Sequence, residues 1–372
     1  MDTRIDRRRL LLAGSAAAVM LPSSAAVAGA RQTTGKPSTT LHYPIRLSAN
    51  ENPYGPGPAA RAAIAAVTED ASRYAFAQVA KLTDAIAGKE QLTKEGIVIS
   101  SGSGELLHML ALTYCERGQL TSAWPTFGQI HAFAEKLGCE VRRVPLDGDM
   151  KHDLPALAKA VSANTSLLYL CNPNNPTGTV VEAAALRAFC EQMAQNTLVV
   201  VDEAYLDLVD GGATASMVDL VRSGANVVVL RTFSKIHGLA GMRVGYALAR
   251  PDVAARLRRL QLTFPNIIGV TAAEASLGDT EFLRTTRAAL LADRQRICAV
   301  CDELGLKYAN PQGNFVFIRV GMPTEDFRKK MLDSQIQVGR AFEPYNDYCR
   351  VTIGTTAETA VFLDALRRII KS

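Results

Sequence analysis

Two runs of apolar residues in the middle of the chain lead into side chains that could do chemistry. Val199–Val201 precedes Asp202, with Tyr205 three residues further on, and Val227–Leu230 leads toward Lys235. A carboxylate at the end of a buried strand is costly unless a cation meets it, and a protonated pyridine nitrogen or a structural ion pair would serve. A lysine in an apolar neighbourhood has a lowered pKa, which Schiff-base chemistry requires. Lys235 and Asp202 are therefore candidate catalytic residues, against the alternatives of a solvated lysine and a structural carboxylate.

A segment rich in glycine and serine predicts a binding site for a phosphate. Ser101-Gly102-Ser103-Gly104-Glu105-Leu106 joins a predicted strand to a predicted helix, where backbone N–H groups and the helix N-terminus attract an anion. The segment is not the dinucleotide motif G-x-G-x-x-G, because Leu107 stands at the third glycine position. Hydroxyls beside Lys235 and the guanidinium of Arg243 could clamp the same phosphate.

A third polar segment, Asn172–Gly178, reads Asn-Pro-Asn-Asn-Pro-Thr-Gly and follows an apolar run that ends at Leu170. Two prolines and a final glycine predict a rigid loop that holds asparagine amides against a polar group. By itself this composition is more typical of an ordinary turn.

The elements that must position these segments alternate between β-rich and helical patterns, which is typical of an α/β protein with a largely parallel sheet. Ligands of such sheets collect at the carboxyl ends of the strands, and each segment above follows such an end. The predicted strands are Ile97–Ser100, Leu120–Ala123, Val141–Pro145, Leu167–Leu170, Leu198–Val201, Val227–Leu230 and Val244–Leu248, and helices are predicted at Glu105–Tyr114, Gln129–Leu137, Leu154–Val161 and Glu182–Met193.

After residue 268 the pattern changes to a long helical stretch, Ala272–Leu304, followed by a strand at Phe315–Val320, a helix at Thr324–Ser334 and a strand at Arg350–Ile353. This pattern predicts a second, smaller α/β domain. We expect a large domain over residues 60–268 and a small domain over residues 269–372. Residues 31–59 form a linker and an N-terminal arm that joins the small domain.

Residues 1–30 have the organisation of an export signal. Arg7–Arg9 precede the apolar run Leu10–Leu21, and small residues with an A-x-A site at Ala26–Ala28 follow. The run is too short and too rich in alanine for a transmembrane helix, and the consecutive arginines resemble the twin-arginine type of signal. We expect a periplasmic protein with no membrane association beyond the signal. The alternative is an uncleaved tail and a cytoplasmic location.

Charge and cysteine content exclude other classes. The net charge is +5, and residues 1–30, with four arginines and two aspartates, supply +2 of it. No basic stripe or basic and aromatic patch indicates nucleic acid. The seven cysteines are scattered and odd in number, which is typical of buried thiols rather than a disulfide framework. Cys298-Ala-Val-Cys301 lacks a second pair, so we predict no metal site.

Seven motifs in a fixed order resemble those of the class I/II aminotransferases of pyridoxal-phosphate (PLP) fold type I, and within them the histidinol-phosphate aminotransferase branch. The resemblance covers residues 45–372. It implies PLP as cofactor, a mostly parallel seven-stranded sheet with helices on both faces, and a smaller α/β domain. The motifs are SANENPYGPGP, SGSGELL, CNPNNPTG, VDEAY, TFSK, GLAGMRVGY and RVTIGT.

The resemblance implies a role for each matching residue. Lys235 would form the Schiff base with the cofactor and then move the substrate proton, and Asp202 would pair with the pyridine N–H. Tyr205 and Asn175 would hydrogen-bond the ring oxygen of the cofactor, and Phe127 would stack on its ring.

Further residues would bind the phosphate and the substrate. Tyr74 would reach the phosphate from the neighbouring subunit, which implies a homodimer, and Arg350 would bind the substrate's α-carboxylate or a phosphate in its place. The phosphate would be held by Ser103, Gly104, Thr232, Ser234 and Arg243, and the substrate pocket would be lined by Asn50, Tyr54, Asn314 and Arg340.

The chain departs from the branch at three places. An acidic residue usually stands where Gly104 is, a tyrosine often stands where Phe127 is, and Ala75-Phe76 replaces the usual Pro-Asp after Tyr74. No catalytic group is lost, but the substrate is left open. Because histidine biosynthesis is cytoplasmic, an exported relative would act on another amino donor.

Three functions are compatible with these residues to different degrees. The leading hypothesis is transfer of an amino group from an L-amino acid, or a related amine such as histidinol phosphate, to a 2-oxo acid. The alternative is a PLP-dependent lyase, decarboxylase or racemase, because fold does not fix reaction class. A non-catalytic sensor domain is disfavoured, since Lys235, Asp202 and Arg243 are all present and no DNA-binding segment precedes residue 45.

Overall fold

The computed structural model describes residues 41–116, 118–211 and 216–371. The chain divides into two units, residues 1–36 and 37–372, and the fold described here is that of the second. The predicted export signal and residues 31–40 of the predicted linker lie outside the described residues.

A seven-stranded sheet forms the centre of this unit, with the strand order β2-β8-β7-β6-β5-β3-β4. β8 is antiparallel to both of its neighbours and the other strand pairs are parallel, so the predicted mostly parallel sheet is confirmed. Every predicted strand of the sheet is present. The strands are β2 (Ile97–Ser100), β3 (Gln119–Trp124), β4 (Glu140–Pro145), β5 (Thr165–Cys171), β6 (Leu198–Asp202), β7 (Val227–Thr232) and β8 (Gly245–Leu248).

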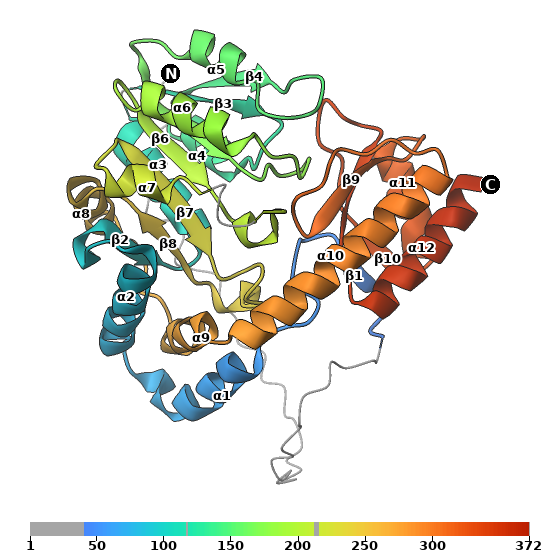
Figure 1. Ribbon diagram of the computed structural model, residues 1–372, viewed down its shortest axis with the longest axis horizontal. Coiled ribbons are helices and arrows are strands. Elements are labelled where there is room, and N and C mark those ends of the chain that lie inside the picture. The colour runs from blue at the N-terminus through green and yellow to red at the C-terminus, as the bar shows by residue number, and fades with distance from the viewer. Residues whose placement is uncertain (1–40, 117, 212–215, 372) are drawn as a thin grey trace, which may run out of the picture. The chain divides into compact units, whose positions relative to one another are not determined.

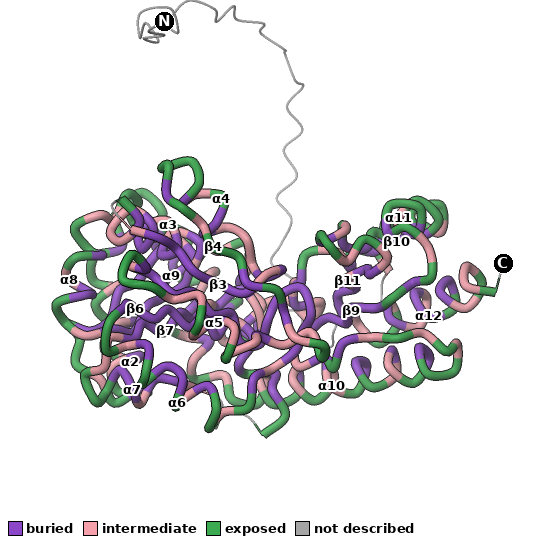
Figure 2. Tube along the Cα trace, turned by 90° about the horizontal axis from the view of Figure 1, so that it is seen from above, coloured by how far each residue is buried: buried purple, intermediate pink, exposed green. Residues whose placement is uncertain are grey.

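Helices cover both faces of the sheet because successive strand residues alternate between two cores. In β6, Val199 and Val201 face one core and Leu198 and Val200 face the other. Figure 2 shows the buried strands between helices whose outer faces are exposed. The first core is covered by α1 (Pro58–Val67), α2 (Phe76–Glu90), α5 (Leu154–Ala160), α6 (Ala183–Met193), α7 (Val218–Arg222) and α9 (Ile267–Leu277), and the second by α3 (Ser103–Tyr114), α4 (Gln129–Lys136) and α8 (Pro251–Arg259).

A separate core lies in the C-terminal part of the chain and includes residues of the N-terminal arm (Figure 1). The arm strand β1 (Ile45–Leu47) pairs in parallel with β10 (Ile336–Val338). Two further strands, β9 (Phe315–Arg319) and β11 (Tyr348–Thr352), pair antiparallel. The helices of this part are α10 (Thr280–Glu303), α11 (Thr324–Asp333) and α12 (Thr356–Lys371).

The predicted helical stretch Ala272–Leu304 is wrong in one respect, because it consists of two helices, α9 and α10. The chain breaks at Gly278-Asp279, where the carboxylate of Asp279 accepts hydrogen bonds from the backbone N–H groups of Phe282 and Ala59. Aspartate favours this capping position over a helix interior. α9 packs in the core of the large sheet. The predicted domain limits themselves stay a prediction.

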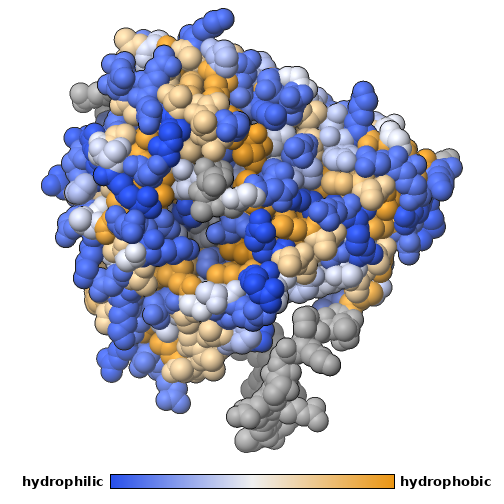
Figure 3. All heavy atoms as spheres, viewed as in Figure 1, coloured by the Kyte–Doolittle hydropathy of each residue, from blue (hydrophilic) through white to orange (hydrophobic). Residues whose placement is uncertain are grey.

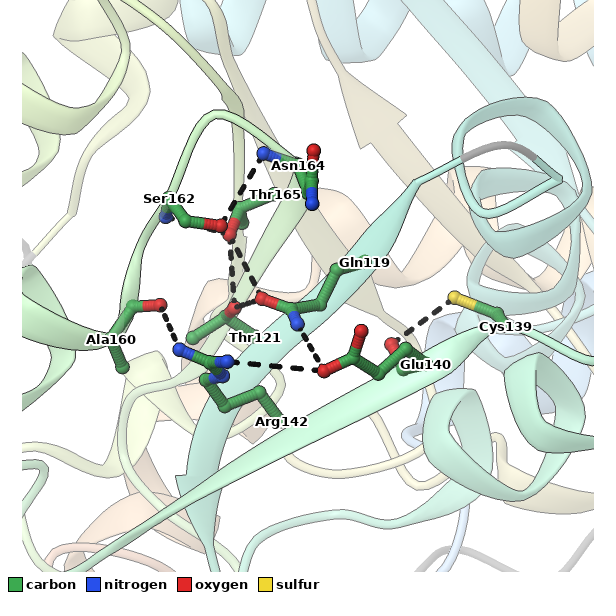
Figure 4. Close-up of polar contacts among 9 residues, drawn as sticks. All are labelled: Gln119, Thr121, Cys139, Glu140, Arg142, Ala160, Ser162, Asn164 and Thr165. Carbon is green, nitrogen blue, oxygen red and sulfur yellow. Dashed lines mark hydrogen bonds and ion pairs between the residues drawn. The ribbon is translucent and has the colours of Figure 1, made fainter.

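At the amino ends of β3, β4 and β5, polar side chains fix the strand register (Figure 4). The amide of Gln119 donates to Glu140 and accepts from Thr121 and Thr165. The register between β3 and β5 shifts between Gln119 and Leu120, beside these side-chain hydrogen bonds. This network lies at the opposite end of these strands from the polar loops that follow them.

Polar side chains cover much of the visible face in Figure 3, with apolar patches between them. Within the described residues, none of the helices is both long enough and apolar enough to cross a membrane. All seven cysteines lie in the described part of the chain as free thiols, and six of them are buried.

Candidate active site

Lys235 lies three residues after the end of β7, at the carboxyl edge of the sheet. Its Nζ atom donates a 2.9 Å hydrogen bond to the backbone carbonyl of Asn50, in the N-terminal arm. Burial and, after it, the positive charge of Arg350 lower the pKa of Lys235 to about 8. The lowered pKa increases the fraction of this amine that is uncharged near neutral pH and can react with a carbonyl group.

Asp202 is the last residue of β6 and only 2% of it is exposed. Its Oδ2 accepts a 3.1 Å hydrogen bond from Tyr169, and its Oδ1 accepts one of 3.2 Å from the N–H of Ala204. Burial raises the pKa of Asp202 to about 6. Neither lysine nor arginine among the described residues forms an ion pair with this carboxylate, so it can receive a cationic group from a ligand.

A hydrogen-bonded chain links the arm to the loops after β5 and β6. The hydroxyl of Tyr205 accepts hydrogen bonds from the amides of Asn50 at 3.0 Å and Asn175 at 3.4 Å. Asn50 has a positive φ of 53° and is also held by Thr352 of β11. Burial raises the pKa of Tyr205, so its hydroxyl stays protonated and can donate to an oxygen of a ligand.

Arg350 of β11 reaches across to the same loops. Its guanidinium donates to Asn175 Oδ1 and to the carbonyl of Ser48, both at 2.6 Å. Its Nε atom is buried without an acceptor among the described residues. The guanidinium also lies 5.2 Å from the centre of the Phe342 ring. A partly buried cation with a free donor fits a carboxylate or a phosphate group.

An anion cradle forms where α3 begins. Gly102 precedes the helix with φ 87° and no side chain caps the helix N-terminus. The guanidinium of Arg243 occupies the space beside Gly102, because a Cβ there would lie 2.8 Å from Arg243 Cζ. Gly245 lies against the backbone N of Ser103 in the same way. Free N–H groups at a helix N-terminus beside a guanidinium attract an anion.

The hydroxyls of the loop after β7 adjoin this cradle. Thr232 is paired with Gly245 in the sheet, and its Oγ1 donates to Ser234 Oγ at 2.9 Å. The predicted phosphate residues Ser103, Gly104, Thr232, Ser234 and Arg243 therefore lie around one point at the carboxyl edge.

A cavity of about 480 Å³ opens beside Asn175 and Arg350. Phe127 and Arg340, both predicted site residues, line it, and the Arg340 guanidinium stacks 4.3 Å above the ring centre of Phe342. Trp124 and Gln129 form other parts of its wall. Aromatic and arginine side chains line the cavity together, and such a lining suits an organic anion.

Three predicted residues lie apart from this group or at its margin. Tyr54 hydrogen-bonds with Thr356 of α12, and burial raises its pKa. Asn314 donates to the carbonyl of Glu51 at 3.0 Å and has a buried Oδ1 without a partner among the described residues. Tyr74 is 75% exposed and packs on Phe76 and Phe264 rather than beside Lys235.

Two residues that the sequence did not single out belong to the site. Tyr169 hydrogen-bonds Asp202, and Gln129 lies over the first turn of α3. Tyr169 sits inside an apolar strand and Gln129 at the start of a helix, so neither position has a local signal of function. In the described part of the chain, no group of three histidine, cysteine or acidic side chains could hold a metal ion.

The fold and these residues define a protein of the aminotransferase class. The chain matches the family described as aminotransferase class I and II over residues 43–366 and belongs to it.

The relatives make the likeness more specific. The chain is 38% identical to histidinol-phosphate aminotransferase of Moorella thermoacetica, over 88% of this chain and 85% of that one. It is 35% identical to an aromatic amino acid aminotransferase of Mycobacterium sp. (strain KMS), over 90% and 95%. The crystal structure of histidinol-phosphate aminotransferase from Sinorhizobium meliloti in complex with pyridoxal-5'-phosphate superposes with a TM-score of 0.82 and 30% identity, covering 88% of this chain and 91% of that one.

Proposed function

We propose that this chain is a PLP-dependent aminotransferase that transfers an amino group from an L-amino acid, or a related amine such as histidinol phosphate, to a 2-oxo acid. The observation that carries the proposal is the pair of Lys235 and Asp202 at the ends of neighbouring strands. One is an amine whose pKa is lowered to about 8, and the other is a buried carboxylate without a cationic partner among the described residues.

The residues present fit PLP. The cradle of Gly102, Ser103 and Arg243 suits its phosphate, and Asp202 suits its ring nitrogen. Tyr205 and Asn175 suit its ring oxygen. When bound, PLP supplies an aldehyde that joins to amines and a protonated ring that accepts the electrons left when a substrate proton departs.

Lys235, Asp202 and Tyr205 would each have a separate task toward the bound cofactor and substrate. Lys235 would hold the cofactor through its amine, and its Nζ atom, when free, would accept the substrate proton and return it. Asp202 would keep the ring nitrogen protonated, because a buried carboxylate is stabilised by a positive charge beside it. Tyr205 donates from its hydroxyl, since its raised pKa keeps it protonated.

Arg350 supports transamination over the alternatives. Its buried Nε and aromatic surroundings suit a substrate carboxylate that stays bound through the reaction. A decarboxylase would have to release the substrate carboxylate. The guanidinium of Arg350 is held in place by Asn175 and Ser48, which favours a reaction in which the carboxylate stays bound. A lyase or racemase on the same fold is the second candidate.

The proposal is tested by absorbance spectra of the purified holoenzyme before and after single amino donors, with histidinol phosphate and aromatic amino acids among them. Conversion of the aldehyde-type band to the amine form with some donors, and its return on adding a 2-oxo acid, is expected. A band that persists with every donor would favour the lyase or racemase alternative.

A homodimer is a further part of the proposal. Tyr74, Phe76 and Phe264 form an exposed aromatic cluster, with ring centres 5.1–6.1 Å apart. The neighbouring Thr263 bonds to Glu105 in the first turn of α3, so the cluster adjoins the rim of the anion cradle. A two-fold axis through this face would bring Tyr74 of one subunit to the cradle of the other.

Light scattering on the purified protein tests this arrangement. A dimer mass is expected for the wild type and a monomer mass for Phe264→Asp. A carboxylate buried in the apolar contact between the subunits would destabilise the dimer. A wild type that is monomeric at micromolar concentration would contradict it.

Export is proposed on the sequence alone. Arg7 and Arg8 would direct the folded protein to the periplasm, and their replacement by lysine is expected to retain it in the cytoplasm. An unchanged distribution between cell fractions would favour the cytoplasmic alternative.

A further inference from the structure

The first turn of α3 contains a space that the side chain of another element fills. Gly104 is buried in this turn, and a Cβ built on it would lie 2.6 Å from Nε2 and 2.7 Å from Oε1 of Gln129. Gln129 opens α4 and lines the cavity two residues after Phe127. Its terminal amide therefore lies over the helix N-terminus, where the sequence has glycine instead of a side chain of its own.

The orientation of this amide is fixed by one neighbour. Gln129 Nε2 lies 3.2 Å from Nε2 of His108, one turn further along α3. His108 stacks on Phe133, and burial lowers its pKa, so its ring is neutral at pH 7 and accepts the bond. An amide nitrogen carries two N–H groups. The second N–H of Gln129 has no acceptor among the described residues.

In the described part of the chain, further hydrogen-bond donors without an acceptor lie in the same first turn of α3. The backbone N–H groups of Ser103 and Gly104 have no acceptor among the described residues, and no side chain caps the helix. Arg243 adds a guanidinium on the Gly102 side. A phosphate dianion would satisfy these donors together.

We propose that Gln129 is a ligand of the cofactor phosphate and that Gly104 is required because it leaves room for this amide. The inference rests on the proposed use of PLP. It assigns a cofactor-binding role to a residue that lies in none of the seven motifs of the sequence.

The test compares the binding of PLP and of pyridoxal, which lacks the phosphate, to the apoenzyme by absorbance titration. Gln129→Met keeps the shape of the side chain and removes its hydrogen bonds. The dissociation constant for PLP is expected to rise about tenfold or more, as for a lost hydrogen bond to a charged group. The constant for pyridoxal is expected to stay unchanged, which also shows that the variant is folded.

Two more single variants and one double variant extend the comparison. Gln129→Glu should weaken PLP binding more than Gln129→Met, because its carboxylate repels the phosphate. Gly104→Ala should also weaken PLP binding, since its methyl group displaces the amide, and the double variant with Gln129→Met should be no weaker than the worse single one. The controls are Gln337→Met, at the one exposed position of β10, and Gly148→Ala, where a Cβ meets nothing within 4 Å.

Equal losses for PLP and pyridoxal would overturn the inference in favour of a packing role for Gln129. Unchanged PLP binding in Gln129→Met would also overturn it, while leaving the proposed function intact. A wild-type apoenzyme that does not bind PLP would contradict the proposed function and the inference together.

Discussion

The hydroxyl of Tyr169, in β5, donates a 3.1 Å hydrogen bond to the buried carboxylate of Asp202, at the end of β6. This bond lowers the pKa of Asp202, while burial, the larger influence, raises it. Tyr169 therefore helps to keep the carboxylate ionised without neutralising it. The negative charge stays available for a cationic ring nitrogen.

Replacing Tyr169 by phenylalanine removes that hydrogen bond and leaves the aromatic packing. We expect kcat to fall about tenfold, because one hydrogen bond to a charged group is lost. The acid limb of the pH profile should also move to higher pH, since the pKa of Asp202 rises further. The control is Tyr308→Phe, where the tyrosine donates to the exposed Asp302. Identical profiles for the wild type and Tyr169→Phe would contradict the assigned role.

Asp202→Ala removes the negative charge itself. We expect a loss of about 3–5 kcal/mol of transition-state stabilisation, or roughly 10²- to 10⁴-fold in kcat, as for other preorganised charge partners. Steady-state kinetics of the reconstituted variant measures this, with exposed Asp302→Ala as the control. A kcat within tenfold of the wild type would disprove the pairing of Asp202 with the ring nitrogen.

The lowered pKa of Lys235 makes the stability of the apoprotein depend on pH. Below pH 8 the ammonium is charged in both the folded and the unfolded state, and its burial costs stability. Between about 8 and the ordinary lysine value of 10.5 the unfolded state binds more protons, so stability rises with pH.

We expect Lys235→Met to be more stable than the wild type at pH 7, with a difference that shrinks as the pH rises toward 10.5. Urea unfolding measures this, and a difference that stays constant with pH would refute it. Lys89→Met, at an exposed position, is the control.

Arg350→Lys tests carboxylate binding. A lysine cannot form a bidentate contact with a carboxylate while also donating hydrogen bonds to Asn175 and Ser48, as the guanidinium does. We expect KM for a carboxylate donor to rise about 10- to 100-fold, as for lost hydrogen bonds between charged groups, with a smaller change in kcat. Arg319→Lys, exposed on β9 and paired with Asp347, is the matched control. An unchanged KM would exclude Arg350 as the carboxylate site.

Local sequence pattern was sufficient to predict the sheet and to single out Asp202, Lys235 and the anion cradle as candidates, whereas the other predicted site residues were implied by the family resemblance. The strands could be recognised because each is an apolar run bounded by turn residues. Asp202 and Lys235 lie at strand ends, where parallel strands gather ligands. The cradle could be predicted because each of its two segments, Ser101–Leu106 and Thr232–Arg243, carries its small and hydroxyl residues within a short stretch of the chain.

The parts that were not predicted depend on contacts between distant residues. β1 and β10 are three-residue strands, too short for a pattern, and they form only against each other. Tyr169 and Gln129 gain their roles from Asp202 and Gly104, which other elements bring beside them. The break between α9 and α10 depends on a capping aspartate within a continuous helical pattern.

The most direct test of the account is to fix the cofactor with borohydride and to map the modified peptide by mass spectrometry. The holoenzyme is reduced, digested and sequenced, with Lys235→Ala as the control. The account predicts a pyridoxyl group on Lys235 in the wild type and none in the variant. A modification on another lysine, or none in a wild type that retains its absorbance band, would contradict the central claim that Lys235 holds the cofactor.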